Sequence, residues 1–271
     1  MAGHVSTLGE RRCWLPPGEI RSGASILAEI IDGMTGTQRS RSPATARYWP
    51  VSGLRLRLEL PPRSGGAGLE MRSPDDADLA SLAGLAEAGV HDPAVQPFAV
   101  AWTDAEPAVR ARSVLQYHWR CLGAWSPADW TLNLAVVCDG IVVGTQGLSA
   151  TDFAVLREVS SGSWLGRSYQ GRGIGTAMRA AALALAFDGL GAQHATSDAF
   201  TDNAASLGVS RKLGYAADGI ARHVIRGQPV ESRRLRLDRA SWQAAGGAAG
   251  LGLGEVVLEG LEPCLPLFGL G

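Results

Sequence analysis

The loop between residues 164 and 176 carries the residues whose types and spacing point most clearly to chemistry. An apolar run ends at Leu165, a polar stretch with Gly171, Gly173 and Gly175 follows, and an Ala-rich segment begins after it. Glycine lets a ligand approach the backbone closely, and the first turn of a helix directs free N–H groups at an anion. The loop is therefore predicted to bind a pyrophosphate group through its free backbone amides.

Other phosphate-binding loops fit this stretch less well. A dinucleotide-binding loop has the pattern G-x-G-x-x-G, but Thr176 stands at the third glycine position. The acidic partner of such a loop would be Asp188, which falls inside the predicted helix rather than at the end of a second strand. A Walker loop also fails, because no Gly-Lys-Ser/Thr follows the glycines. A glycine-rich turn without a ligand stays an alternative, since a lone glycine pattern is weak evidence.

A second motif follows about thirty residues later, where Asn203 to Tyr215 reads N-A-A-S-L-G-V-S-R-K-L-G-Y. Together with Gln170-x-x-Gly173-x-Gly175, this segment resembles the motif pair of the GNAT superfamily of CoA-dependent N-acyltransferases. It is most similar to the RimJ/RimL-like branch of that superfamily. An actinobacterial group of these proteins also resembles this chain in its Trp164-Leu165-Gly166 strand end and its Gly-Leu-Glu-Pro-Cys-Leu tail.

The resemblance implies an α/β (α+β) GNAT fold, in which a mixed, mostly antiparallel sheet splays into a V and carries helices on both faces. The co-substrate would be acetyl-CoA or another acyl-CoA. Its pantetheine arm would enter between the strand ending at Leu165 and the strand containing residues 196–198, like an added strand. Its pyrophosphate would accept hydrogen bonds from the amides of residues 172–176. Asn203 would anchor an amide of the arm. The alternative role of Asn203 is to start the next helix, and both roles can hold because Asp202 or Thr201 could cap instead. The residues implied to bind CoA are Trp164, Leu165, Gln170, Gly171, Arg172, Gly173, Ile174, Gly175, Thr176 and Asn203.

Catalysis would need a neutral amine, a stabilised oxyanion and a proton for the departing thiolate. Many members of the family use a tyrosine on the helix of the second motif as the acid, but Ser210 stands at that position here. Ser206, which ranks slightly higher, or Ser210 would then donate to the thiolate, although either could instead bond back to a helix carbonyl. Glu158 is the candidate base, directly or through water, with an ion-paired surface role as the alternative. Asp198 and His118 rank lower.

We therefore expect an N-acyltransferase that moves an acetyl or a succinyl group from acyl-CoA to a primary amine by direct attack in a ternary complex. The amine would belong to a protein N-terminus, a lysine or a small molecule. A non-catalytic acyl-CoA sensor or scaffold on the same fold is the alternative, and a nucleotide-dependent oxidoreductase is disfavoured. The acceptor site is expected between two early helices and the final hairpin, where converging cations would favour an acidic peptide or a succinyl group. These cations are Arg222, His223, Arg226, Arg234 and Arg236.

Composition argues against several other classes of partner. The 26 acidic and 25 basic residues nearly cancel, so neither nucleic acid nor a membrane is an expected partner. The four cysteines lie far apart without a C-x-x-C pair, which favours reduced thiols in a cytoplasmic protein. His118 and Cys121 alone do not make a metal site, so none is expected. No apolar run is long enough for a bilayer, and the N-terminus lacks the apolar core of a signal peptide.

Three regions are predicted along the 271 residues. They are a flexible extension at 1–50, the acyltransferase domain at 51–240, and a Gly/Ala-rich linker with an apolar tail at 241–271. The tail would dock on the domain or on a second subunit, which would make a homodimer. Within the domain, the element order is a strand, two helices, three strands, a helix, a strand, a helix and two strands. Ser73 is the predicted cap of the first helix, and Gly227-Gln228-Pro229 the turn of the final hairpin.

Overall fold

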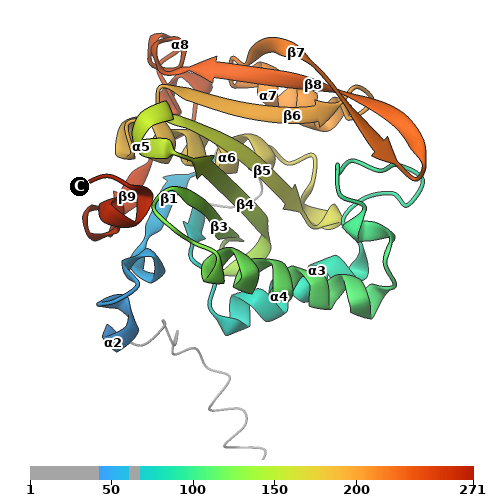
Figure 1. The fold of residues 1–271 in the computed structure, drawn as a ribbon, viewed down its shortest axis with the longest axis horizontal. Coiled ribbons are helices and arrows are strands. Elements are labelled where there is room, and N and C mark those ends of the chain that lie inside the picture. Colours follow the sequence, from blue (N-terminus) through green and yellow to red (C-terminus); the bar gives the residue numbers. More distant parts are fainter. Residues whose placement is uncertain (1–42, 61–67) are drawn as a thin grey trace, which may run out of the picture. The chain divides into compact units, whose positions relative to one another are not determined.

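The computed structural model of the chain describes residues 43–60 and 68–271 (Figure 1). They belong to one compact unit, Ser40–Gly271, and most of the predicted extension at 1–50 lies outside the described residues. The end of that extension, however, is folded: Pro43–Ala46 forms α2 and Pro50–Gly53 a 3-10 turn, η1. Trp49 packs edge-on against Trp125 with the ring centroids 5.5 Å apart, which ties this segment to the core.

The described strands form one mixed sheet in the order β7-β8-β6-β5-β4-β3-β2-β1-β9. Every neighbouring pair is antiparallel except β5 and β6, which are parallel. The mixed, mostly antiparallel sheet predicted from the motifs is confirmed. The strands are β1 Arg55–Glu59, β2 Gly68–Arg72, β3 Asp129–Cys138, β4 Ile141–Thr151, β5 Glu158–Leu165, β6 His194–Phe200, β7 Ala216–Ile225, β8 Gln228–Asp238 and β9 Val257–Glu259.

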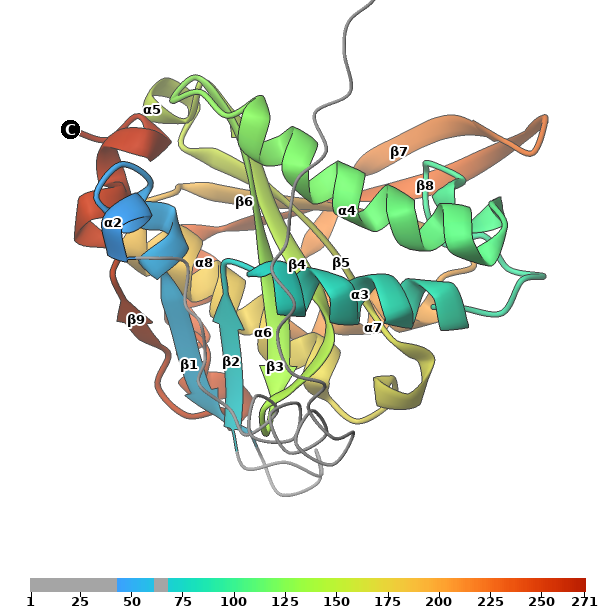
Figure 2. The same cartoon turned by 90° about the horizontal axis from the view of Figure 1, so that it is seen from below.

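Helices cover both faces of the sheet (Figures 1 and 2). On one face, α3 (Asp76–Ala88) and α4 (Pro107–Gly123) lie side by side and bury Leu79, Leu82 and Val114 against β3 and β4. On the other face, α6 (Ile174–Ala184) is buried along almost its whole length and continues into a π turn, η5 (Leu185–Gly189). The shorter elements are α5 Phe153–Leu156, α7 Ala204–Lys212, α8 Arg239–Ala244 and the 3-10 turns η3 Trp102–Asp104, η4 Arg167–Tyr169, η6 Ala249–Leu251 and η7 Glu262–Phe268.

Two local predictions need correction. The cap of α3 is Asp75 rather than Ser73, because Asp75 and Asp78 form a reciprocal capping box, in which each side chain accepts from the other residue's amide. The turn of the final hairpin is Arg226-Gly227, both with positive φ, whereas Pro229 already pairs with Val224 inside the sheet. A two-residue turn with two positive φ values matches the twist of the strands that it joins.

The C-terminal segment completes the far edge of the sheet. β9 pairs with β1, and the following turn η7 buries Cys264 and Phe268. The Phe268 ring lies 4.8 Å from that of Trp130, and Trp125 Nε1 donates to the carbonyl of Leu267 at 2.8 Å. Residues 241–271, set apart in the sequence as a linker and tail, therefore belong to the same compact unit.

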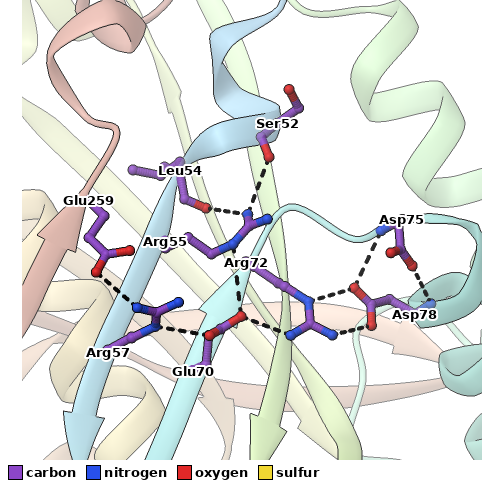
Figure 3. Close-up of polar contacts among 9 residues, drawn as sticks. All are labelled: Ser52, Leu54, Arg55, Arg57, Glu70, Arg72, Asp75, Asp78 and Glu259. Atoms are coloured by element: carbon purple, nitrogen blue, oxygen red, sulfur yellow. Dashed lines mark hydrogen bonds and ion pairs between the residues drawn. The ribbon is translucent and has the colours of Figure 1, made fainter. Parts of the chain in front are cut away.

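An ion-pair network connects this edge with the start of α3 (Figure 3). Arg57 bonds to Glu259 of β9 and to Glu70 of β2, and Glu70 in turn accepts from Arg72. Arg72 places two hydrogen bonds of 2.8 and 2.9 Å on Asp78 in α3. Burial raises the pKa of Glu70, but the hydrogen bonds from Arg72 and Arg57 outweigh it and lower that pKa overall. The network holds β9, β1, β2 and α3 together at the surface.

Among the described helices, none is long and apolar enough to cross a membrane. The described residues also contain no group of three or more His, Cys, Asp or Glu side chains that could hold a metal ion.

Candidate active site

β5 and β6 separate part-way along their length. They pair only from Glu158 to Ser160, opposite residues 194–196. Beyond this point β5 keeps its other partner, β4, to Leu165, and β6 keeps β8 to Phe200. The facing edges of the two strands are thus left without strand partners, which is the V expected from the sequence. An extended ligand can add to such an edge through main-chain hydrogen bonds.

The loop after β5 presents free amides beside this V. Gly171 and Gly173 have φ values of +74° and +84°, a left-handed conformation that glycine adopts without strain. Thr176 donates its amide to the Gly173 carbonyl at 3.1 Å. Among the described residues, no acceptor takes the amide hydrogens of residues 172–175, which we call the cradle amides. The cradle is therefore one amide shorter than the predicted range of 172–176.

Gln170 fixes the position of this loop. Its side-chain amide donates to the carbonyls of Val90 at 2.7 Å and Leu165 at 2.9 Å. Both side-chain hydrogens are thus used inside the protein, so Gln170 shapes the loop rather than offering a free N–H to a ligand. Leu165 is itself buried, and the Trp164 ring packs against Trp102 with centroids 5.9 Å apart.

Asn203 is the cap of α7, which is the helix-start role that the sequence left open for it beside ligand binding. Its Oδ1 accepts the amide of Ser206 at 3.0 Å. No described residue accepts from Asn203 Nδ2, so the side chain can cap the helix and still donate to a ligand.

The two candidate acids occupy different environments on α7. Ser206 is half-buried in the first turn, and its hydroxyl has no hydrogen bond to a described residue. Ser210 is only 1% exposed, and its hydroxyl accepts from Arg179 Nη1 of α6 at 2.9 Å. Ser210 thus lies in the α6–α7 interface, which leaves Ser206 as the candidate donor to a thiolate.

Arg179 is a buried cation without a carboxylate partner among the described residues. It is 6% exposed, its Nε has no hydrogen-bond partner, and burial lowers its pKa. The buried hydroxyl of Tyr215 lies close enough for its charge interaction with Arg179 to influence both groups, and burial raises the Tyr215 pKa. Leaving a guanidinium this poorly paired costs stability.

The candidate base Glu158 is ion-paired. Arg236 Nη1 donates to Glu158 Oε2 at 2.5 Å, and the same guanidinium approaches Asp218 at 3.4 Å through Nε. Asp198 lies two residues beyond Thr196, the last residue of β6 that pairs with β5. It is exposed, and no described residue bonds to its carboxylate. Of the two carboxylates, Asp198 is therefore the one that is free to accept a proton.

The hairpin β7–β8 reaches the segment between α3 and α4. Arg226, in its turn, donates to both carboxylate oxygens of Asp104 at 2.6 and 2.9 Å and to the carbonyl of Pro93 at 3.3 Å. The hydrogen bonds from Arg226 lower the pKa of Asp104. A cavity of about 380 Å³ lies beside this contact, between the end of α3, the 91–106 segment and η4. Of the five hairpin cations that were expected to converge, only Arg226 lines this cavity.

The other cations of the hairpin are engaged elsewhere. Arg222 lies 4.0 Å from Glu231, and Arg234 donates to the carbonyl of Asp218 at 2.8 Å. His223 shares a hydrogen bond of 2.8 Å with Ser232.

His118, on α4, is 4% exposed, and burial lowers its pKa to about 4. It is therefore a neutral core residue at physiological pH rather than a catalytic base.

Residues 69–216, more than half of the chain, match the family model of the acetyltransferase (GNAT) domain. The chain belongs to the GNAT acetyltransferase family. This confirms the resemblance drawn from the two motifs.

Solved structures similar to this GNAT acetyltransferase include Mycobacterium smegmatis RimJ in complex with CoA-disulfide. It has 19% sequence identity and a TM-score of 0.58, over 73% of this chain and 96% of that one. A second is RimL, a ribosomal L7/L12 alpha-N-protein acetyltransferase in complex with coenzyme A (17% identity, TM-score 0.51, 63% and 93% covered). A third is the ribosomal-protein-S5-alanine acetyltransferase of Vibrio fischeri, with 17% identity and a TM-score of 0.50 over 64% of this chain and 94% of that one. At these identities the likeness concerns the fold.

The sequence ranked some residues of this acetyltransferase site too low and missed others. Asp198 was named only as a lower candidate than Glu158, because nothing local distinguishes a free carboxylate from a paired one. The buried Arg179 carries one signal, a charged residue inside an otherwise apolar Ala-rich helix. The contact of Arg226 with Asp104 joins positions 122 residues apart and leaves no local pattern.

Proposed function

We propose that this GNAT acetyltransferase transfers an acetyl group from acetyl-CoA to the α-amino group of a protein or peptide acceptor. The amine attacks the thioester directly in a ternary complex. The observation that carries this proposal is the set of four cradle amides at the head of α6, beside the separated edges of β5 and β6. RimL is a ribosomal L7/L12 alpha-N-protein acetyltransferase and the Vibrio fischeri protein is a ribosomal-protein-S5-alanine acetyltransferase, which supports a protein N-terminus as the acceptor class.

Acyl-CoA binding would use three parts of the site. The cradle amides and the positive end of the α6 dipole would hold the pyrophosphate. The pantetheine arm would extend along the free edge of β5 towards Ser160, where the strands rejoin. Asn203 Nδ2 would donate to a carbonyl of that arm.

The transfer itself needs one proton to be taken from the amine and the leaving thiolate to be stabilised. The amine nitrogen bonds to the thioester carbon, the carbon–sulfur bond then breaks, and the coenzyme leaves as its thiolate. We assign Ser206 as the hydrogen-bond donor to that sulfur. The proton released by the amine would pass to a carboxylate, directly or through water: Asp198 is free for this role, whereas Glu158 must first leave Arg236.

The test follows thiol release from acetyl-CoA in the presence of three acceptors: a peptide with a free α-amine, the same peptide with its α-amine blocked and a lysine added, and a polyamine. Release with the first alone, with a matching mass shift at the peptide N-terminus, supports the proposal. Asp198→Asn should lower kcat about a hundredfold and Glu158→Gln much less. The reverse order would assign the base to Glu158.

A non-catalytic acyl-CoA sensor is the second candidate function. Two of the three predicted catalytic side chains favour it, because they are already engaged within the protein. Ser210 is buried against Arg179, and Glu158 is ion-paired with Arg236. Calorimetric binding of acetyl-CoA without thiol release for any amine would support the sensor.

Comparing acetyl-CoA with succinyl-CoA in the same titration tests the donor. If Arg226→Ala is equally active with both esters, the succinyl alternative fails.

A further inference from the structure

The cavity beside the Arg226–Asp104 contact carries an excess of positive charge. Three guanidinium groups line it, those of Arg110, Arg167 and Arg226, whereas Asp104 is its one acidic lining residue among the residues described. These three guanidinium groups and one carboxylate together have a net charge of +2. Its volume of about 380 Å³ lies within the range of small-ligand pockets.

The three cations of this cavity differ in how far they are engaged. Arg226 is neutralised by its two hydrogen bonds to Asp104. Arg110 donates only to backbone carbonyls, so its position is fixed while its charge stays uncompensated. Arg167 is exposed, and its guanidinium bonds to no described residue. Arg167 is thus the group that is free to bind an anion.

The number of residues between Arg167 and Ser160 gives an estimate of how far the cavity lies from the vertex of the V. Arg167 comes seven residues after Ser160, the last position at which β5 pairs with β6. At about 3.3 Å per residue, this separation is roughly 20 Å. An extended peptide whose α-amine reaches the vertex of the V would therefore bring roughly its fourth to seventh residues to the cavity.

We propose that the cavity binds a carboxylate of the acceptor, so that the enzyme prefers peptides with an acidic side chain several residues after the reacting amine. Arg167 would take the carboxylate in a bidentate contact, and the fixed charge of Arg110 would strengthen the field around it. This inference rests on the proposed function, because it assigns the acceptor class to the same site. Arg167 acts here as a specificity residue and takes no part in the chemistry.

The same guanidinium chemistry would also suit a phosphate, and the 3′-phosphate of CoA is one available source. The two sources are distinguishable through the donor. A role in CoA binding would make Arg167→Gln raise KM for acetyl-CoA and leave KM for 3′-dephospho-acetyl-CoA unchanged. A role in acceptor binding changes KM for the acidic peptide with either donor.

The experiment uses seven-residue peptides with a free α-amine and a single Asp, Asn or Lys at each position from 2 to 7. The full-length enzyme should favour Asp over Asn by about tenfold in kcat/KM at one or two positions between 4 and 7, since one charge-assisted contact has about this effect. Arg167→Gln should abolish the preference, and Arg167→Glu should shift it to Lys. Arg222→Gln removes an equal charge from an exposed site outside the cavity and should retain the preference.

Equal rates for Asp and Asn peptides at every position would overturn the inference and leave the proposed function standing. A preference for Asp that survives in Arg167→Gln would likewise overturn the assignment to this cavity. If none of the peptides is acetylated, the proposed function itself fails.

Discussion

The side-chain amide of Gln170 donates a hydrogen bond of 2.7 Å to the carbonyl of Val90, which lies 80 residues earlier in the chain. This bond joins the start of the cradle loop to the segment that follows α3, and a second bond of 2.9 Å returns to Leu165. One side chain therefore positions the cradle loop relative to the segment after α3, where Val90 lines the cavity.

Replacing Gln170 by Ala should loosen the cradle. Two partly buried carbonyls would lose their donor, at a cost of about 1–3 kcal/mol in the free energy of unfolding. KM for acetyl-CoA should rise by about tenfold, because the cradle amides would no longer be held in one arrangement. Steady-state kinetics and urea unfolding measure the two effects. Gln193→Ala, at an exposed glutamine before β6, should change neither; an unchanged KM in Gln170→Ala would refute the positioning role.

Gly173→Ala should weaken acyl-CoA binding beyond its effect on folding. Its φ of +84° disfavours any residue with a Cβ by about 1–2 kcal/mol, and Gly173 itself carries one of the cradle amides. The matched control is Gly140→Ala in the β3–β4 turn, where φ is +81° and the space around a Cβ is open. We expect similar losses in the free energy of unfolding, but a raised calorimetric Kd for acetyl-CoA in Gly173→Ala alone. Equal Kd values would place the pyrophosphate elsewhere.

The sequence predicted this site as far as local patterns reach. The glycines of the cradle and the alternating leucines of β1 are readable within a few residues, because turn geometry and burial impose them locally. Side-chain partners were not readable. Glu158 is held by Arg236, 78 residues later, and Ser210 by Arg179, 31 residues earlier. Which carboxylate is free and which hydroxyl is buried depends on how α6, α7 and β8 pack, and that is a tertiary property.

The edge of the sheet shows the same limit. The apolar tail was expected to dock on some surface, but the sequence could not identify β1 as its partner. Arg57 and Glu259, which connect the two strands, are 202 residues apart. A strand of three residues carries too little periodicity to be recognised, and its place is determined by the edge that it pairs with.

Ser210→Ala should reduce stability and leave kcat nearly unchanged. Removing the hydroxyl takes away the hydrogen-bond acceptor of a buried guanidinium, which should cost about 1–3 kcal/mol. The double variant Ser210→Ala/Arg179→Met should lose less free energy of unfolding than the two single variants added together. Once Arg179 is removed, no buried charge is left without its acceptor. Urea unfolding of the two single variants and the double variant measures this coupling. A hundredfold loss of kcat in Ser210→Ala, with Ser206→Ala unaffected, would instead make Ser210 the acid.

His118 should make the protein sensitive to acid. Burial lowers its pKa in the folded state to about 4, below the value of 6.5 for an exposed histidine. The unfolded chain therefore binds a proton first as the pH falls, so the stabilising contribution is complete above pH 6.5 and is lost as the pH falls towards 4. By pH 5 the loss should reach about 2 kcal/mol. His118→Gln is the control, because glutamine cannot titrate. The free energy of unfolding of the wild type and of this variant is measured in urea at pH 7.5, 6 and 5. The difference between the two proteins isolates the histidine from the carboxylates. A difference that stays constant across these pH values would show that His118 is accessible to protons in the folded state.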